Sequence, residues 1–463
     1  MNRLVTALIA LILAALALPV ASAQDVGTSD RPHEPSGQVK EASKAPEHRL
    51  RTADWLDIAF SERLRYETLD NRFHPGEKGG DQQMPQRTRI GIGIKRIIDP
   101  LRFQFEFEDS RAHLTDSGSL VTNTMVDEHD ILQAYVALAF NQKPGAGLPT
   151  TLYVGRQSFD LGNRRLFARN RYRNTTNRWD GIRWTIAAPK KWSLDAFFFL
   201  PVRPDMEQMD RRVKGAYFWG GYFGAPLKSG VNGELYYFGL WEDPDLTLSL
   251  KRRHSTIGGR LYKDSKPRAI GFEIESAWQF GKNADLDHFA HLQHGQVTYT
   301  FDFQWQPSIS GHYDYASGDE DPNDTRSGNF DTLYGARRWE YGPTGIYNWM
   351  YRTNISSPAL YFGLKPTKKL EVIPSLRWQW LAQAKARWAG GLLQDPIGQS
   401  GTYVGASMEW RLRYSFHPYF RPEIGYTRFF KGTFAKDAPG SPNTRDTNYF
   451  FVELELRIDD LIK

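Results

Sequence analysis

From Trp55 to the C-terminus, hydrophobic and polar residues alternate in short segments, which is typical of strands with one apolar face. In residues 101–108 four apolar residues alternate with four polar ones: Leu101, Phe103, Phe105 and Phe107 against Arg102, Gln104, Glu106 and Glu108. Similar alternation recurs in 87–95, 297–305, 404–414 and 450–458. The pattern predicts an all-β protein.

Eighteen segments fit this reading, at 55–68, 86–98, 100–111, 128–141, 150–158, 178–188, 192–201, 214–225, 230–242, 255–263, 268–281, 295–306, 308–317, 356–365, 369–382, 402–415, 417–430 and 446–458. Segments 150–158 and 214–225 alternate poorly, so sixteen strands is the alternative count.

The connections between these segments alternate in length. Long polar connections follow the odd-numbered segments, and short turns rich in Pro, Gly and Lys follow the even-numbered ones. Long extracellular loops and short periplasmic turns characterise outer-membrane barrels. We therefore expect a closed antiparallel transmembrane β-barrel, most simply of 18 strands, with both termini in the periplasm. A soluble β-sandwich or propeller would not require this alternation of loop lengths.

A barrel in lipid must pair every strand and turn its apolar face outward. At 297–305 this places Phe303 toward lipid and Asp302 toward the lumen. Five tryptophans should then lie at the membrane interfaces: Trp278, Trp305, Trp378, Trp380 and Trp410. Eighteen strands enclose a lumen too wide for wall side chains to fill, so an aqueous channel is expected unless loops plug it.

Composition supports this interpretation. The chain has no cysteine, 14% aromatic residues, 40 glycines and only 40% hydrophobic residues, with a mean hydropathy of −0.56. Residues 1–23 carry a basic start, an apolar core and an Ala-Ser-Ala end, as a secretory signal peptide does. Residues 24–51 should form a flexible periplasmic tail, and 52–463 the barrel. The formal net charge of +6 is too small to indicate a ligand.

The segment 152–184 is dense in arginine. It holds eight arginines, no lysine and two acids, and the predicted loop 159–177 lies within it. Arginine donates hydrogen bonds from a rigid fork that matches carboxylates and phosphates. We expect this loop to fold into the barrel mouth, where Arg164, Arg165 and Arg169 would favour anions.

Inward charges should be segregated around the lumen. Basic residues concentrate on the first three and last four segments, whereas a group of acids lies on the opposite wall: Glu234, Glu273, Glu275, Asp302 and Asp314. Either an anion path or a ladder of structural salt bridges could explain this arrangement.

Sites of other kinds are poorly supported. His288, His291 and His294 lie in a predicted loop without zinc spacing, and the acidic run 319–324 lacks the glycine and final glutamate of an EF-hand loop. No catalytic constellation points to an enzyme such as an outer-membrane phospholipase, and no basic-aromatic module points to nucleic acid. We expect no enzyme activity, no cofactor and no metal.

Several motifs, in this order, resemble the alginate-export family of bacterial outer-membrane proteins: Ser61–Glu67, Arg87–Arg89, Phe105–Asp109, Gly155–Gln157, Leu161–Leu166 and Arg178–Gly181. The resemblance covers about residue 52 to the end. It implies a monomeric eighteen-stranded barrel that passes an anionic polysaccharide through an arginine-lined constriction. By position, the constriction role falls on Arg63, Arg65, Arg87, Arg89, Arg156, Arg164, Arg165, Arg178, Arg411, Arg413 and Arg457.

The chain differs from this pattern in ending Ile462-Lys463 rather than in an aromatic residue, and in having no long periplasmic turn that could act as a plug. The expected function is an outer-membrane channel for an alginate-like polysaccharide or another acidic solute, with outer-membrane lipid and periplasmic export components as partners. The alternative is a structural or adhesive barrel with a loop-plugged pore, whose aromatic-rich segment Tyr334–Tyr351 would be the contact surface.

Overall fold

The computed structural model describes residues 55–76, 79–95, 98–119, 121–142, 147–243 and 251–458. The predicted signal peptide and periplasmic tail lie outside these residues. No helix in the described part of the chain is both long and apolar enough to cross a membrane.

Eighteen long strands make up the barrel wall: β1 (Leu56–Leu69), β2 (Asp81–Lys95), β3 (Leu101–His113), β4 (Asp127–Phe140), β5 (Thr150–Gln157), β6 (Trp179–Ala188), β7 (Trp192–Arg203), β9 (Ala216–Pro226), β10 (Asn232–Glu242), β11 (Arg252–Lys263), β12 (Ile270–Asn283), β13 (Leu286–Thr300), β14 (Ser308–Ala316), β16 (Ile355–Gly363), β17 (Leu370–Trp380), β18 (Tyr403–Tyr414), β19 (Phe420–Lys431) and β20 (Thr447–Arg457). Each corresponds to one predicted segment. Two-residue strands β8 (Arg211–Arg212) and β15 (Arg326–Ser327) belong to connections, as do the helical turns η1 (Lys228–Gly230), α2 (Arg338–Tyr341) and α3 (Thr433–Asp437).

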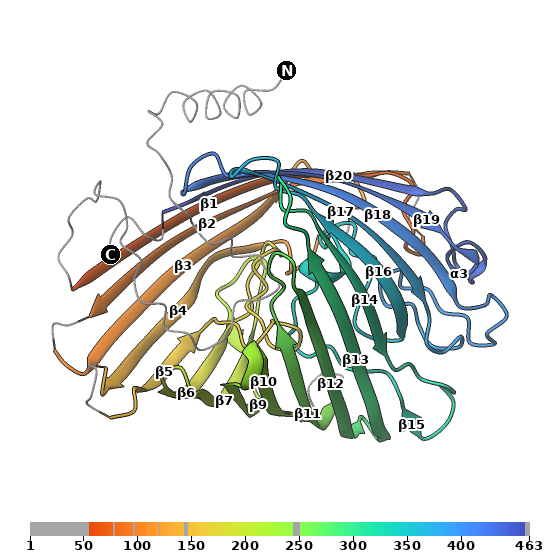
Figure 1. Cartoon of the computed structure of the whole chain (residues 1–463). Coiled ribbons are helices and arrows are strands. Elements are labelled where there is room, and N and C mark those ends of the chain that lie inside the picture. Colours follow the sequence, from red (N-terminus) through yellow and green to blue (C-terminus); the bar gives the residue numbers. More distant parts are fainter. Residues whose placement is uncertain are drawn as a thin grey trace. The chain divides into compact units, whose positions relative to one another are not determined.

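Strand β1 closes the barrel, because it pairs antiparallel with both β2 and β20. Figure 1 shows β1, β2 and β20 side by side although β20 lies at the far end of the chain. In this register Arg63 lies opposite Arg87 on one side and Glu455 on the other. Closure leaves the sheet without an open edge, as lipid requires.

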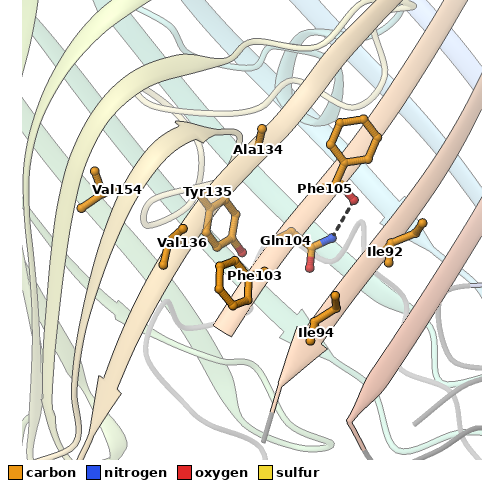
Figure 2. A pocket seen from close by; sticks show the side chains of 9 residues that line it. All are labelled: Ile92, Ile94, Phe103, Gln104, Phe105, Ala134, Tyr135, Val136 and Val154. Carbon is orange, nitrogen blue, oxygen red and sulfur yellow. Dashed lines mark hydrogen bonds between the residues drawn. The ribbon is translucent and has the colours of Figure 1, made fainter. Parts of the chain in front are cut away.

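The two faces of the wall separate as predicted. On β2, Ile90 and Ile92 are 45% and 41% exposed, whereas Arg87 and Arg89 are buried. Figure 2 shows the residues that line a hollow in the wall at β2 to β5. They are mainly apolar, with Gln104 and Tyr135 as the polar ones: Ile92, Ile94, Phe103, Phe105, Ala134, Val136 and Val154. Such an apolar surface suits contact with lipid acyl chains.

The region from β12 to β14 differs from the prediction. A tight turn at Ala284 and Asp285 joins β12 to β13, so the predicted loop 282–294 is mostly strand. His288, His291 and His294 therefore lie on β13 rather than in a loop. The strand ends at Thr300, which places Asp302, Phe303 and Trp305 in the following turn. Both the inward placement of Asp302 and the lipid-facing strand position of Phe303 are wrong.

Two long connections, 158–178 and 317–354, pack inside the barrel. Phe167 stacks on Trp179 with ring centroids 4.3 Å apart, and also contacts the inward-facing Phe197 and Phe218 of the wall. In the second connection, the ring centroid of Trp349 lies 5.2 Å from that of Phe429 of β19. These rings form one apolar cluster on the inner face of the barrel. The sequence predicted 318–355 as an extracellular loop; in the structure Tyr341, Tyr347 and Trp349 of this connection are buried and pack inside the barrel.

Candidate functional site

Loop 158–178 bridges the two charged walls of the lumen. At one end Arg165 contacts β12, and at the other the main chain of 171–173 contacts β1 and β2. Arg164 has a φ of 71° and Gly162 a φ of 53°, so two left-handed residues turn the chain sharply beside Arg165. A Cβ at Gly162 would lie 2.0 Å from the Tyr222 hydroxyl, so the wall itself requires glycine there.

The basic wall holds this loop by its carbonyl groups. Arg63 donates to the main-chain oxygens of Arg171, Tyr172 and Arg173 at 2.8, 3.0 and 3.2 Å. Arg87 donates to the oxygens of Arg171 and Arg173 at 2.7 and 3.1 Å. Both guanidinium groups are buried, so their charge is directed to the loop backbone rather than to an open channel.

Arg65 and Arg89 are paired with acids as well as with the loop. Arg65 binds Glu453 at 2.7 Å through Nε, donates to the Tyr172 oxygen at 3.0 Å, and lies 3.7 Å above the Tyr172 ring. Arg89 binds Glu108 at 2.7 Å and the Thr176 hydroxyl. These contacts anchor 172–176 against β1, β2 and β3.

The acidic wall binds Arg165, which is fully buried. Its Nη1 lies 2.9 Å from Glu273 and contacts Glu275, and its Nε lies 2.9 Å from Glu340 in the second lumenal loop. Burial lowers the pKa of Arg165, but Glu340, Glu275 and Glu273 outweigh this effect and hold the pKa well above its usual value. Arg165 thus joins both loops to β12. Sequence reasoning found the wall acids but missed Glu340, because nothing in 317–354 marked it as inward.

The other acids of this wall are also paired. Glu234 lies 2.9 Å from Arg260 and accepts the Tyr222 hydroxyl at 2.5 Å. Asp314 accepts hydrogen bonds from His294 and Arg377, both at 2.7 Å. Asp302, in contrast, pairs with Arg268 at 2.8 Å in the exposed turn after β13 and takes no part in the wall.

The remaining predicted constriction residues lie in ion pairs at other places on the wall. Arg413 binds Glu423 at 2.9 Å and Glu371 at 3.3 Å, and Arg411 lies 3.8 Å from Glu423. Arg457 binds Glu455 at 3.1 Å. Arg156 binds Asp180 at 2.8 Å, and the buried Arg178 lies among Asp127, Asp130, Asp210 and Glu108.

Three arginines of loop 158–178 have unfilled donors: Arg164, Arg169 and Arg171. Among the described residues, the half-buried side chains of Arg164 and Arg171 have neither a hydrogen bond nor an ion pair. Burial and the neighbouring Arg169 lower the pKa of Arg171 to about 10, which leaves the group charged at neutral pH. Arg169 lies 3.6 Å from Glu106, but its Nε and Nη2 make no hydrogen bond. The loop therefore presents guanidinium groups that an anion could bind.

A closed antiparallel barrel of 18 strands, with a charged lumen and an apolar outer wall, defines an outer-membrane β-barrel channel. The sequence model of the alginate export family matches residues 54–448. The chain belongs to that family, whose members are channels and not enzymes, and it is an outer-membrane protein.

Solved structures with the same fold include Pseudomonas aeruginosa OpdK with vanillate, at a TM-score of 0.60 and 10% identity over 87% of this chain and 98% of that one. Acinetobacter baumannii OccAB1 aligns with a TM-score of 0.58 and 12% identity over 89% and 98%. Pseudomonas aeruginosa OccK11 aligns with a TM-score of 0.56 and 11% identity over 87% and 96%. At this identity the likeness concerns the fold. The search of curated proteins gave no match.

Proposed function

We propose that this channel passes an acidic polymer of the alginate type, or smaller acidic solutes, and that loop 158–178 supplies the anion-binding groups. The observation that carries the proposal is the pair of unpartnered guanidinium groups, Arg164 and Arg171, on a loop fixed between the two walls. A carboxylate can accept charge-assisted hydrogen bonds from each of them. Several weak sites in series allow an anion both to enter and to leave.

The other predicted arginines have a different role in this proposal. Arg63, Arg65, Arg87 and Arg89 hold the loop, and Arg165 fastens it to the acidic wall. Their charges are largely compensated by carbonyls and carboxylates. The anion preference should therefore depend on Arg164 and Arg171 more than on the buried wall residues.

Passage of a polymer also requires the lumenal loops to shift, because 158–178 and 317–354 pack against each other across the lumen. The Ala168 amide donates to the Tyr334 oxygen at 3.1 Å, and the Tyr334 amide donates to the Leu166 oxygen at 3.1 Å. We propose that the two loops move as one unit, since Arg165 and these backbone bonds join them.

The alternative of a structural or adhesive barrel with a plugged pore gains support from the same packing. Its predicted contact surface does not, because Tyr341, Tyr347 and Trp349 are buried inside the barrel. An outward-facing adhesive surface at 334–351 is therefore inconsistent with the fold.

The test is the reversal potential of single channels in a salt gradient near 10 mM, where screening is weak. Arg164→Gln combined with Arg171→Gln should lower the anion-to-cation permeability ratio. Arg445→Gln, an exposed arginine of the loop after α3, is the matched control and should leave the ratio unchanged. An unchanged ratio in the double variant, with the barrel folded, would show that these groups lie outside the ion path.

A further inference from the structure

A second charged cluster lies in the wall around Arg178. Asp127 and Asp130 of β4, Glu108 of β3 and Asp210 before β8 surround this guanidinium, and all five residues are at most 5% exposed. One oxygen from each of Asp127, Asp130 and Asp210 lies within 4.8 Å of the others. The three oxygens are thus close enough to share one ion.

The ion pairs of this cluster do not balance. Contacts of 4.0 Å or less between nitrogen and oxygen atoms link four arginines to six carboxylates. The network therefore carries two more negative charges than positive ones. Its arginines are Arg89, Arg156, Arg169 and Arg178, and its acids are Glu106, Glu108, Asp127, Asp130, Asp180 and Asp210. Buried charge without compensation is costly, so this excess calls for a cation or for protons.

Two oxygens in the cluster also lack hydrogen bonds. Asp127 Oδ1 is buried and makes none, while the other oxygen of that carboxylate binds Arg178. Asp210 Oδ2 lies 3.2 Å from Arg178 Nε without forming a hydrogen bond, and its Oδ1 accepts the Asp205 amide at 2.7 Å. Buried carboxylate oxygens normally have partners. The Asp127 oxygen is therefore available as a ligand that no protein group uses.

We propose that Asp127, Asp130 and Asp210 bind a divalent cation of the calcium class beside Arg178. Carboxylate oxygens are the ligands that hard cations prefer, and calcium accepts irregular sets of oxygens. One such ion would supply the two missing positive charges. This revises the expectation, drawn from sequence, that the chain binds no metal.

A cation held by Asp210 would also stabilise the structure around this cluster. The ion would tie the β7–β9 connection to β4 and fix Arg178, the last residue of loop 158–178.

Calcium titration of the purified barrel in detergent, after treatment with EDTA, tests the proposal. Calorimetry of the wild-type protein should show one bound Ca²⁺, and Ca²⁺ should raise the midpoint of thermal unfolding. Asp127→Asn and Asp210→Asn should each weaken binding at least tenfold, because each removes a charged ligand. Asp321→Asn, in the acidic run 319–324, is the control and should titrate like the wild type.

Failure of the EDTA-treated wild-type protein to bind Ca²⁺ would overturn the proposal, as would undiminished binding by Asp127→Asn. Loss of binding in Asp321→Asn alone would place the ion in 319–324 and would equally contradict it. If Asp210→Asn does not fold, the titration of Asp127→Asn decides, because asparagine keeps the size of the side chain and an acceptor for Arg178.

Discussion

The Arg165 guanidinium lies 2.9 Å from the Glu273 carboxylate, in an ion pair from which water is excluded on both sides. The same guanidinium binds Glu340, so one side chain joins β12, loop 158–178 and loop 317–354. Removing one partner of a buried ion pair leaves the other charge uncompensated, at a cost of about 3–5 kcal/mol. Arg165 is therefore a structural residue of the lumen.

Arg165→Gln should release the lumenal loops while the barrel stays folded. The barrel wall is held by eighteen paired strands, whereas the loops depend on a few buried contacts, so the change should act locally. We expect larger and noisier single-channel conductance, and faster proteolysis within 158–178, with heat-modifiable migration unchanged. Arg445→Gln, at an exposed position of the loop after α3, is the control and should alter neither property. Unchanged conductance in Arg165→Gln would contradict the anchoring role.

The two faces of β3 can be separated by adjacent substitutions. Phe105 lies on the outer wall and is 43% exposed, whereas the side chain of the neighbouring Gln104 lies beside Gly93 and Asp57 on the inner face. Phe105→Arg should lower the free energy of unfolding by about 2–4 kcal/mol if the residue lies near the bilayer midplane, as on other outer-membrane barrels. Gln104→Arg should lower the free energy of unfolding much less. Urea unfolding in lipid vesicles measures both, and equal costs would mean that the register of β3 is shifted by one residue.

Much of the fold followed from periodicity, because a strand with lipid on one side and polar groups on the other must alternate. The alternation failed at 214–225, where Phe218 faces the lumen and Trp219 the other way. The reason is physical: an inner wall that packs against a loop can be as apolar as the outer wall. Apolar residues on both faces of 197–199 and 217–219 were the signal for an occupied lumen.

The site was less predictable than the wall. The pattern correctly placed Glu273, Glu275, Arg63 and Arg87 on inner faces, but could not reveal which charges compensate one another, since Arg165 and Glu340 come from loops without periodicity. The turn at 301–307 was missed because Val297, Tyr299 and Phe301 continue the alternation of β13 into it.

Loop docking should weaken in acid through Asp331 of the second lumenal loop. This carboxylate binds Arg252 at 2.9 Å and His254 at 3.0 Å. Burial raises the pKa of Asp331, but Arg252 and His254 outweigh burial and hold the pKa well below its usual value. Because the pKa of the Asp331 carboxyl is lower in the docked loop, its negative charge stabilises docking at pH values above the pKa of the undocked group, near 4. This stabilisation is lost as the pH falls further.

Conductance of the wild-type channel should therefore be steady from neutral pH to about pH 4 and rise below it. Asp331→Asn should show raised conductance already at pH 7 and a smaller rise in acid. Single-channel recordings across this pH range measure the effect. A wild-type and a variant with the same pH profile would show that Asp331 does not hold the loop.

The most direct test of the central claim is the reversal potential of the wild-type channel in a gradient of the potassium salt of a uronic acid, at low ionic strength. If loop 158–178 presents free guanidinium groups to the ion path, the uronate should be more permeant than potassium, and an acidic oligosaccharide should reduce the conductance. A channel that prefers potassium and is unaffected by the acidic oligosaccharide would contradict the account.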